Sequence, residues 1–332
     1  MKENDMLDVL PEEEDLRLDR VLARLRPELG LRGRRRLCGT GCVLVNGRPA
    51  PEGRKMKAGD RVEIRDAAPE SDACPSAASP FLYPADAPRI IGREDAEGLL
   101  FLHKPAGLHT EPLAGRPGPS LADELAGMPS PGSGFPRLVN RLDRPTSGIV
   151  TAAADSRGLA FYQDAQDAGR TEKCYLALLE GSLRADVLEK GRLLMKDRER
   201  VLVELTPHAD RRRHTYISPL AVLKGAALPA EIRAFFPCSQ TPAAVTLAGC
   251  TILKGARHQI RAHAAAAGFP LLGDRRYGAS CVPPEDAEEA FFLHHALLVL
   301  PGCRAVDIPA WLPLLGADAE ASARRWLGLS AR

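Results

Sequence analysis

The sequence RLDRPTSGIVTAA, residues 141–153, sets the interpretation of the whole chain. Proline and glycine punctuate its first half too closely for a helix, and residues 148–153 form a short apolar run typical of a buried strand. Asp143 is therefore expected on a loop that enters a strand, where a rigid scaffold can present a reactive group. Taken alone, the run is more typical of a surface ion pair between Asp143 and Arg141 or Arg144.

Three further stretches change that interpretation. They are FLHKPAGL at 101–108, EKCYLA at 172–177, and GARHQIRAH through GFPLLGDRRYG at 255–278. Together with residues 141–148 they resemble the signature segments of the RluA-type RNA pseudouridine synthases, in which the patterns are HRLDRxTSG, KPxGL, KxYxA and GRxHQIRxH followed by GxPIxGDxxYG. The four segments occur in the order that the family has, between about residues 99 and 300.

The resemblance implies an α+β fold, with a catalytic domain built on a mixed, largely antiparallel sheet. It implies an isomerase that converts specific uridines in structured RNA to pseudouridine, with large-subunit ribosomal RNA favoured and tRNA as the alternative. Asp143 matches the catalytic aspartate, and Arg261 matches the arginine that pairs with it, although 118 residues separate the two. Tyr175 is the expected stacking platform for the extruded uracil. No redox change or net energy input occurs, so we expect no cofactor. We also expect no metal, because the spacings of the histidines fit no metal-ligand template.

The same comparison predicts which side chains contact RNA phosphates in the catalytic domain. These are Arg141, Arg144, Arg257 and Lys173, the last on the same face of a strand as Tyr175.

Two departures from the family pattern occur near these residues. Asn140 stands where the family has histidine, and Lys254-Gly255-Ala256 replaces the usual Thr-Gly before Arg257. We expect altered loop packing or substrate preference, because asparagine still donates and accepts hydrogen bonds.

The N-terminal part of the chain is strongly basic. Residues 17–65 contain 14 Lys or Arg and 5 Asp or Glu, a net of +9, which leaves −7 for the rest of a chain whose net charge is +2. Apolar residues from Leu16 to Leu25 recur at helical spacing, and a cluster containing Arg34, Arg35 and Arg36 opens a second short helix.

A strand with a hairpin turn at VLVNG, residues 43–47, and a strand at 61–65 follow. This order resembles a small α/β RNA-binding module named after ribosomal protein S-four, and implies that the basic cluster contacts RNA.

The predicted organisation has four parts: a disordered leader at 1–14, the S-four-like RNA-binding domain at 15–66, a linker at 67–89 rich in Ala, Pro and Ser, and the catalytic domain at 90–332. In the catalytic domain we expect strands at 99–104, 173–179 and 246–253, and helices at 156–168 and 258–267. Ser156 is the expected N-cap of the first helix. Residues 189–224 read as charged and irregular apart from a strand at 201–205.

Composition excludes several classes of protein. Eight cysteines are scattered along 332 residues, which does not fit a small disulfide scaffold, and CGTGC at 38–42 lacks the spacing of a zinc site. No apolar run reaches the ~18 residues of a membrane span, and the N-terminus is acidic where a secretory signal is basic. We therefore expect a cytoplasmic monomer with no membrane partner.

Two other functions fit parts of the sequence. The first is a non-catalytic RNA-binding or ribosome-assembly protein with a decayed pocket, in which Asp143→Asn leaves RNA binding unchanged. The second is a glycoside or nucleoside hydrolase. Glycosidases usually need two carboxylates about 5 to 9 Å apart, and only Asp143 lies in a strong motif.

Overall fold

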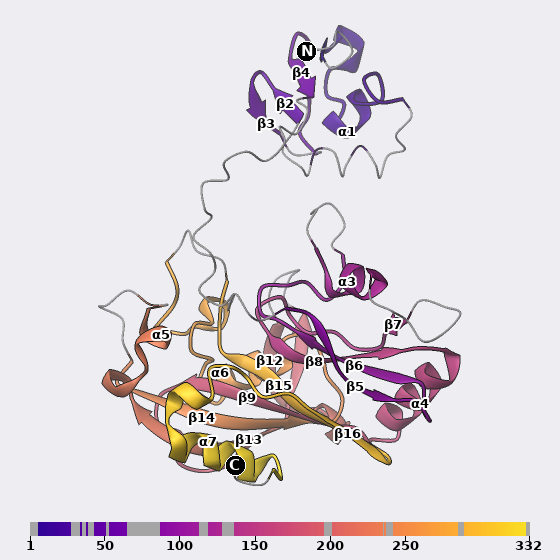
Figure 1. The fold of residues 1–332 in the computed structure, drawn as a ribbon. Coiled ribbons are helices and arrows are strands. Elements are labelled where there is room, and N and C mark those ends of the chain that lie inside the picture. Colours follow the sequence, from indigo (N-terminus) through magenta and orange to yellow (C-terminus); the bar gives the residue numbers. More distant parts are fainter. Residues whose placement is uncertain are drawn as a thin grey trace. The chain divides into compact units, whose positions relative to one another are not determined.

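The computed structural model describes residues 6–27, 34, 38, 43–50, 53–64, 87–112, 119–127, 136–195, 201–234, 236, 242–284 and 289–329. The chain divides into two compact units (Figure 1). One comprises Met1–Ser76 with Glu111–Ser120, and the other comprises Ala77–Thr110 with Leu121–Arg332.

The N-terminal unit is a four-stranded sheet in the order β1-β4-β2-β3, with strands β1 (Met6–Asp8), β2 (Val43–Val45), β3 (Arg48–Pro49) and β4 (Arg61–Ile64). The short helix α1 (Leu18–Val21) packs its buried leucines and valine into the same small core. Asn46 and Gly47 connect β2 to β3 with φ of +51° and +77°, the left-handed pair that a tight hairpin turn requires. The predicted strands and turn of this region are therefore present.

The prediction of a disordered leader at 1–14 is wrong for its described part. Met6–Asp8 pairs antiparallel with β4, and Val9 is buried in the core, so apolar side chains at this end fix the chain. The helix expected over residues 16–25 is also shorter, because regular helix ends at Val21 and turns follow. Arg34 is half-buried, whereas Arg35 and Arg36 lie outside the described residues.

The second unit is built on one sheet of ten strands, with the path β10-β13-β14-β9-β15-β8-β6-β5 and with β16 and β7 paired to β15 and β8. Among the described strands only β8 and β15 pair in parallel, which confirms the predicted mixed, largely antiparallel sheet. The strands are β5 (Arg89–Glu94), β6 (Leu99–Lys104), β7 (Arg137–Leu138), β8 (Ser147–Ala153), β9 (Glu172–Glu180), β10 (Val187–Glu189), β13 (Thr215–Lys224), β14 (Ala244–Ile252), β15 (Leu293–Leu300) and β16 (Cys303–Val306).

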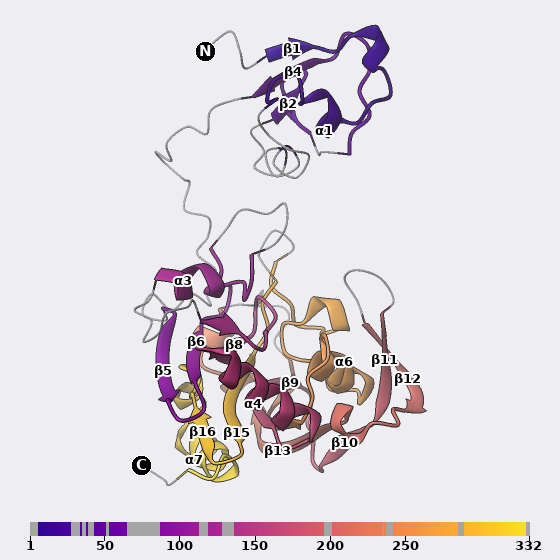
Figure 2. The same cartoon turned by 90° about the vertical axis from the view of Figure 1, so that its right-hand side faces the viewer.

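Helices cover both faces of this sheet, as Figure 2 shows. They are α3 (Leu121–Gly127), α4 (Ser156–Asp167), α5 (Ala230–Arg233), α6 (Gln259–Ala266) and α7 (Ala317–Trp326). The central strand β9 explains the layers, because Tyr175, Ala177 and Leu179 enter the core that α6 covers. Cys174, Leu176 and Leu178 enter the core that α7 covers. The predicted period of two is correct, and both faces are buried.

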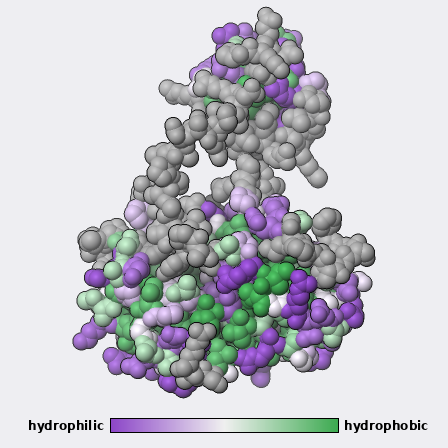
Figure 3. All heavy atoms as spheres, in the orientation of Figure 1, coloured by the Kyte–Doolittle hydropathy of each residue, from purple (hydrophilic) through white to green (hydrophobic). Residues whose placement is uncertain are grey.

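Hydrophobic residues also reach the surface of this unit. On the face drawn in Figure 3 they occur in patches that hydrophilic residues separate. None of the described helices is long and apolar enough to cross a membrane.

Residues 189–224 differ from the sequence prediction, because the described part is mostly strand. A separate hairpin is formed by β11 (Gly191–Met195) and β12 (Val201–Pro207), and β13 is the longest strand of the main sheet. A bulge between Pro219 and Ala221 shifts the register of β13, which hides the period of two from sequence analysis. The N-cap of α4 is Asp155 rather than Ser156, since its carboxylate accepts a hydrogen bond from the Gly158 amide.

Candidate active site

The loop that carries Asp143 is tied to the neighbouring loop at residues 105–110. Lys104 is fully buried at the end of β6, and its Nζ donates to the carbonyls of Pro105, Leu108 and Arg144 at 2.7 to 3.1 Å. The Arg144 Nε donates to the Gly107 carbonyl at 2.8 Å. These contacts explain why a KPxGL segment and an RLDR segment occur in one protein, since one segment fixes the backbone of the other.

Thr110 makes a second connection between the same two loops. Its Oγ1 donates to the Leu142 carbonyl and accepts from the Leu142 amide, at 2.8 and 3.1 Å. Both backbone polar groups of Leu142, the residue before Asp143, are thus hydrogen-bonded. This fixes the backbone from which the Asp143 side chain extends.

Arg261 lies in the middle of helix α6 and points into the protein. Its side chain is 2% exposed and forms a two-bond pair with Asp274, from Nε at 2.7 Å and from Nη2 at 2.9 Å. Nη2 also contacts the Glu289 carboxylate at 2.5 Å. The ring of Phe291 lies 4.3 Å from its guanidinium carbon, so the cation is fixed by charge and by packing.

The structure brings Arg261 and Asp143 together. The Arg261 Nη1 donates to the Asp143 Oδ2 at 3.1 Å, and the Asp143 side chain is 28% exposed. Burial alone would lower the pKa of Arg261, but Asp274, Asp143 and Glu289 outweigh it and raise that pKa. The guanidinium is therefore permanently charged, and a half-buried carboxylate lies beside it with one side open to solvent.

Tyr175 lies in β9, next to the same carboxylate. Burial is the largest cause that raises the pKa of its phenol, and the negative charge of Asp143 adds to it, so the phenol stays neutral. Its ring stacks on the His295 ring of β15, with 4.5 Å between the centroids and 15° between the planes. One face of Tyr175 is thus already occupied by protein.

The four side chains predicted to contact RNA in this unit lie in different surroundings. Arg141 and Arg257 are exposed and Arg144 is half-buried. Lys173 contradicts the prediction, because its side chain is 4% exposed, its Nζ donates to the Gln166 Oε1 at 2.9 Å and it lies over the Tyr162 ring. Burial lowers its pKa to about 8. Lys173 belongs to the packing between β9 and α4 and cannot reach a phosphate.

Asn140 has a structural task at the start of β8. Its Oδ1 accepts from the Thr151 amide at 2.7 Å, so the residue holds the incoming loop against the strand. The expected effect of the departure from histidine, on loop packing or on substrate preference, stays a prediction. The segment before Arg257 is also tied to the helix, since the Ala256 amide donates to the Gln259 Oε1 at 2.9 Å.

Sequence analysis missed several residues of this site. Asp274 lies within the GDRRYG segment, whose resemblance to the family pattern was the signal that was available. Glu289 follows a short acidic run and carries no such signal. His258 lies with its Nε2 3.8 Å from the Asp143 Oδ2, and its place within the GARHQIRAH segment was the available signal.

A second polar cluster lies behind the loop. The Asp307 carboxylate contacts the His103 Nδ1 at 2.5 Å, and His294 bridges the Asp307 carbonyl and the Ser147 hydroxyl. A cavity of about 80 Å³ lies next to this cluster, and its lining does not include Asp143, Tyr175 or Arg261. The cavity is therefore distinct from the place where the Asp143 carboxylate meets the Arg261 guanidinium.

Known proteins resemble this chain along most of its length. A protein from Aquifex aeolicus (strain VF5), named an uncharacterized RNA pseudouridine synthase, is 28% identical over 299 residues, which cover 86% of this chain and 84% of the relative. A ribosomal large subunit pseudouridine synthase D from Escherichia coli (strain K12) is 27% identical over 307 residues, covering 92% and 85%.

Solved structures agree on the fold. The structure titled Human RNA Pseudouridylate Synthase Domain Containing 1 superposes with a TM-score of 0.53 and 22% identity, covering 70% of this chain and 88% of that one. A family model described as RNA pseudouridylate synthase matches residues 98–266. Because that match spans just over half of the 332 residues and includes the loop of Asp143 and the helix of Arg261, the chain belongs to the RNA pseudouridylate synthase family.

Proposed function

We propose that this RNA pseudouridine synthase isomerises specific uridines in structured large-subunit ribosomal RNA, with Asp143 as the catalytic carboxylate. The observation that carries the assignment of Asp143 is its 3.1 Å contact with the buried Arg261 guanidinium. The choice of ribosomal RNA rests on relatives named ribosomal large subunit pseudouridine synthase D.

The reaction breaks the bond between C1′ of the ribose and N1 of uracil and forms a bond from C1′ to C5. The base turns between the two steps, C5 loses a proton and N1 gains one, so atoms and electrons balance without a cofactor. One ionised carboxylate is enough, as a nucleophile at C1′ or as the base that removes a ribose proton. The Arg261 guanidinium, 3.1 Å from the carboxylate, holds Asp143 in position for either role.

Tyr175 is proposed to contact the uracil that has left the RNA helix. Extraction of a base costs a few kcal/mol, and aromatic side chains recover part of it by stacking. The His295 ring already occupies one face of Tyr175, so the base is proposed to stack on the other face. Arg141, Arg144 and Arg257 are proposed to hold the phosphates on either side.

The N-terminal unit is proposed to be the S-four-like RNA-binding module, with a basic cluster at Arg34, Arg35 and Arg36. Its four-stranded sheet and separate core, which include β1 and Val9, support an independent domain that begins before the expected residue 15 and reaches residue 66. A linker at 67–89 is proposed to join it to the catalytic domain at 90–332. A module that holds RNA raises the effective concentration of the target uridine at the catalytic domain.

The deciding experiment deletes the gene and maps pseudouridines across ribosomal RNA and tRNA. Complementation uses the wild type, Asp143→Asn and, as a matched control, Asp123→Asn at a carboxylate on α3. We expect one or a few ribosomal sites to vanish and to return with the wild type and Asp123→Asn only. Sites that vanish from tRNA instead would replace the proposed substrate, and full rescue by Asp143→Asn would overturn the assignment of Asp143.

A further inference from the structure

All polar contacts of the Asp143 carboxylate fall on one of its oxygens. Arg261 Nη1 lies 3.1 Å from Oδ2 and His258 Nε2 lies 3.8 Å from the same atom. Within the described part of the chain, Oδ1 accepts no hydrogen bond. The carboxylate is therefore held by Oδ2, and Oδ1 is the oxygen turned toward a substrate.

His258 is itself held from its other ring nitrogen. Its Nδ1 lies 3.0 Å from the Tyr277 hydroxyl, whose oxygen accepts from the Val201 amide at 3.0 Å. A phenol has one proton to donate. The Nε2 atom faces the Asp143 carboxylate, which only accepts hydrogen bonds. The arrangement that suits both neighbours therefore has the proton of a neutral His258 on Nε2 and the Tyr277 O–H donating to Nδ1.

The ring is neutral at physiological pH. Burial lowers the pKa of His258 to about 4, the Asp143 charge opposes this, and Arg261, Arg257 and Arg276 add to it. A neutral donor differs from a second cation in its effect on Asp143. It fixes the position of Oδ2 without withdrawing as much charge from the carboxylate, so Oδ1 keeps its reactivity.

The backbone at His258 gives a second, independent sign of constraint. His258 has φ +52° and is the N-cap of α6, a left-handed conformation that is unfavourable for a non-glycine residue. The side chain is 7% exposed, and its ring meets the Tyr277 ring edge to face. Strain of this kind persists where surrounding structure enforces it, and such residues cluster at active sites.

We propose that His258, fixed as its Nε2–H tautomer by Tyr277, is a positioning residue that holds Oδ2 of Asp143 and leaves Oδ1 to react. The inference rests on the proposed function, because it takes Asp143 as the reacting carboxylate. Substrate binding is expected to shorten the 3.8 Å separation to hydrogen-bond length, as catalytic contacts often tighten only in the bound complex.

The test compares substitutions that keep or remove the Nε2 donor. A glutamine at 258 places an amide donor near the position of Nε2, whereas an asparagine reaches only to the position of Nδ1. We expect His258→Asn to slow single-turnover pseudouridine formation about 10- to 100-fold, the range seen when an orienting partner is removed. His258→Gln should recover most of the rate, and RNA affinity should stay within about twofold in both variants because His258 holds Asp143 and not RNA.

Nitrogen NMR of histidine-labelled protein reads the tautomer directly. The wild type should show His258 protonated on Nε2, and Tyr277→Phe should show a mixture of tautomers with a rate between those of the wild type and His258→Asn. His208→Asn, at a half-buried histidine outside the site, is the control and should match the wild type. Thermal melting of every variant separates a loss of rate from a loss of fold.

The variant Asp143→Asn, measured beside these variants, distinguishes failure of the positioning role of His258 from failure of the catalytic role of Asp143. If Asp143→Asn is inactive while His258→Asn reacts at the wild-type rate, or if the wild-type ring is protonated on Nδ1, the positioning role is wrong and Asp143 stands. If Asp143→Asn is active, the proposed function itself fails. A His258→Asn variant that is slow and is not recovered by glutamine also contradicts the role of the donor.

Discussion

At the scale of single residues, the Arg261 guanidinium links three carboxylates that lie far apart in the sequence. Asp143 is one of them, and Asp274 and Glu289 hold the other edges of the group. Asp274 and Glu289 contact Nε and Nη2 of the arginine, which leaves Nη1 for Asp143. The buried contacts of Nε and Nη2 therefore fix the direction in which Nη1 points toward the candidate catalytic residue.

Replacement of Arg261 by lysine should damage both stability and activity. A lysine has a single point of charge and cannot form the two-bond pair with Asp274, so a buried carboxylate is left incompletely paired. We expect a loss of about 3 to 5 kcal/mol in the free energy of unfolding, measured by denaturant titration, and loss of pseudouridine formation. The exposed neighbour Arg257→Lys is the stability control and should change it by less than about 0.5 kcal/mol. Equal stability of the two variants would contradict this account.

His295 should make the stability of the fold depend on pH. Burial lowers its pKa to about 3, its Nδ1 donates to the Ile149 carbonyl at 2.7 Å, and its Nε2 meets no acceptor among the described residues. The unfolded chain takes up this proton near pH 6.5 and the folded chain does not, so stability falls as pH drops from about 6.5 toward 3.

The measurement for His295 is a denaturant titration at pH 7.5 and at pH 5. One proton taken up only by the unfolded state costs about 1.4 kcal/mol per pH unit, or about 2 kcal/mol over this interval below pH 6.5. His295→Asn should be less stable than the wild type and should lose about 2 kcal/mol less on acidification. Carboxylates common to both proteins cancel in the comparison, and equal pH dependence of the two would show that His295 does not contribute.

At the scale of elements, the parallel pairing of β8 with β15 depends on Gly148. This residue has φ +107°, and a Cβ built on it would lie 2.4 Å from the His295 carbonyl oxygen and 2.6 Å from the His295 nitrogen. Only glycine lets the two backbones approach so closely directly after the Asp143 loop. Gly148, the glycine of the TSG segment, is thus required for the pairing of β8 with β15.

Gly148→Ala is expected to lower the free energy of unfolding by about 3 kcal/mol or more, since the left-handed φ costs about 1 to 2 kcal/mol and the backbone clash adds to it. Gly302→Ala is the matched control. Its φ is +77°, but nothing lies within 4 Å of the added carbon, so only the conformational cost applies. Thermal or denaturant unfolding of both variants measures the difference, and equal losses would show that the approach to His295 relaxes freely.

Elements differed in how well the sequence predicted them. Strands β6, β9 and β14 are continuous apolar or alternating runs, and their pattern was sufficient. Strand β13, second in the sheet after the short outer strand β10, carries a proline and a bulge, so its pattern was lost. In the site, the pairing of Asp143 with Arg261 came from family resemblance, because no local pattern relates residues 118 positions apart. The role of Glu289 and the burial of Lys173 depend on tertiary packing and had no local signal.

At the scale of the whole molecule, the net charge is divided between a basic N-terminal segment and an acidic remainder. If the first unit holds RNA through phosphates, affinity should fall linearly with the logarithm of salt concentration. Replacement of Arg34, Arg35 and Arg36 by glutamine should reduce that slope by about 2 to 3. KM should rise while the maximal single-turnover rate stays unchanged, because the catalytic unit is untouched.

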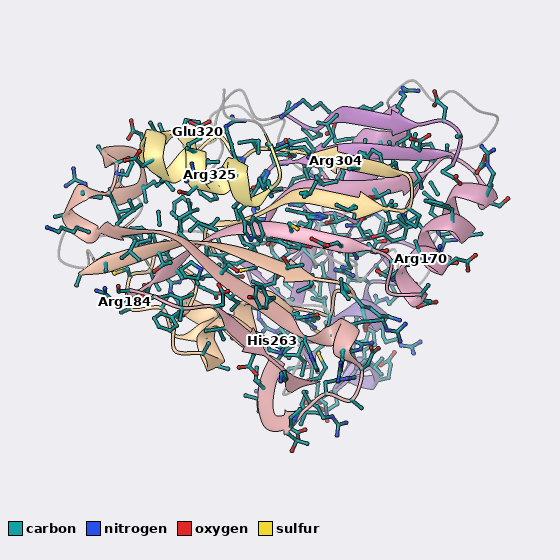
Figure 4. The ribbon with its side chains drawn as sticks, turned by 90° about the horizontal axis from the view of Figure 1, so that it is seen from below. Arg170, Arg184, His263, Arg304, Glu320 and Arg325 are labelled. Atoms are coloured by element: carbon teal, nitrogen blue, oxygen red, sulfur yellow. The ribbon has the colours of Figure 1, made fainter. Side chains whose placement is uncertain are left out.

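The matched control removes three charges from the catalytic unit. Arg184, Arg304 and Arg325, labelled in Figure 4, are exposed and lie in the segment between β9 and β10, in β16 and in α7. The triple substitution of these residues by glutamine changes the net charge equally. Filter-binding or anisotropy titrations across a salt series should give it a slope close to that of the wild type. If the slope of affinity against salt concentration falls equally in both triple variants, the total charge determines it and the basic cluster makes no specific contribution to RNA binding.

The position of β15 in the sheet has a consequence for how this protein is made. The strand lies between β9 and β8 and joins the two halves of the sheet, yet it follows every candidate site residue in the sequence. A nascent chain that ends at residue 292 already contains Asp143, Tyr175, His258 and Arg261 but lacks the strand that brings β8 beside β9. We therefore expect the enzyme to become active only after residues 293–300 have been synthesised and have paired with both neighbours.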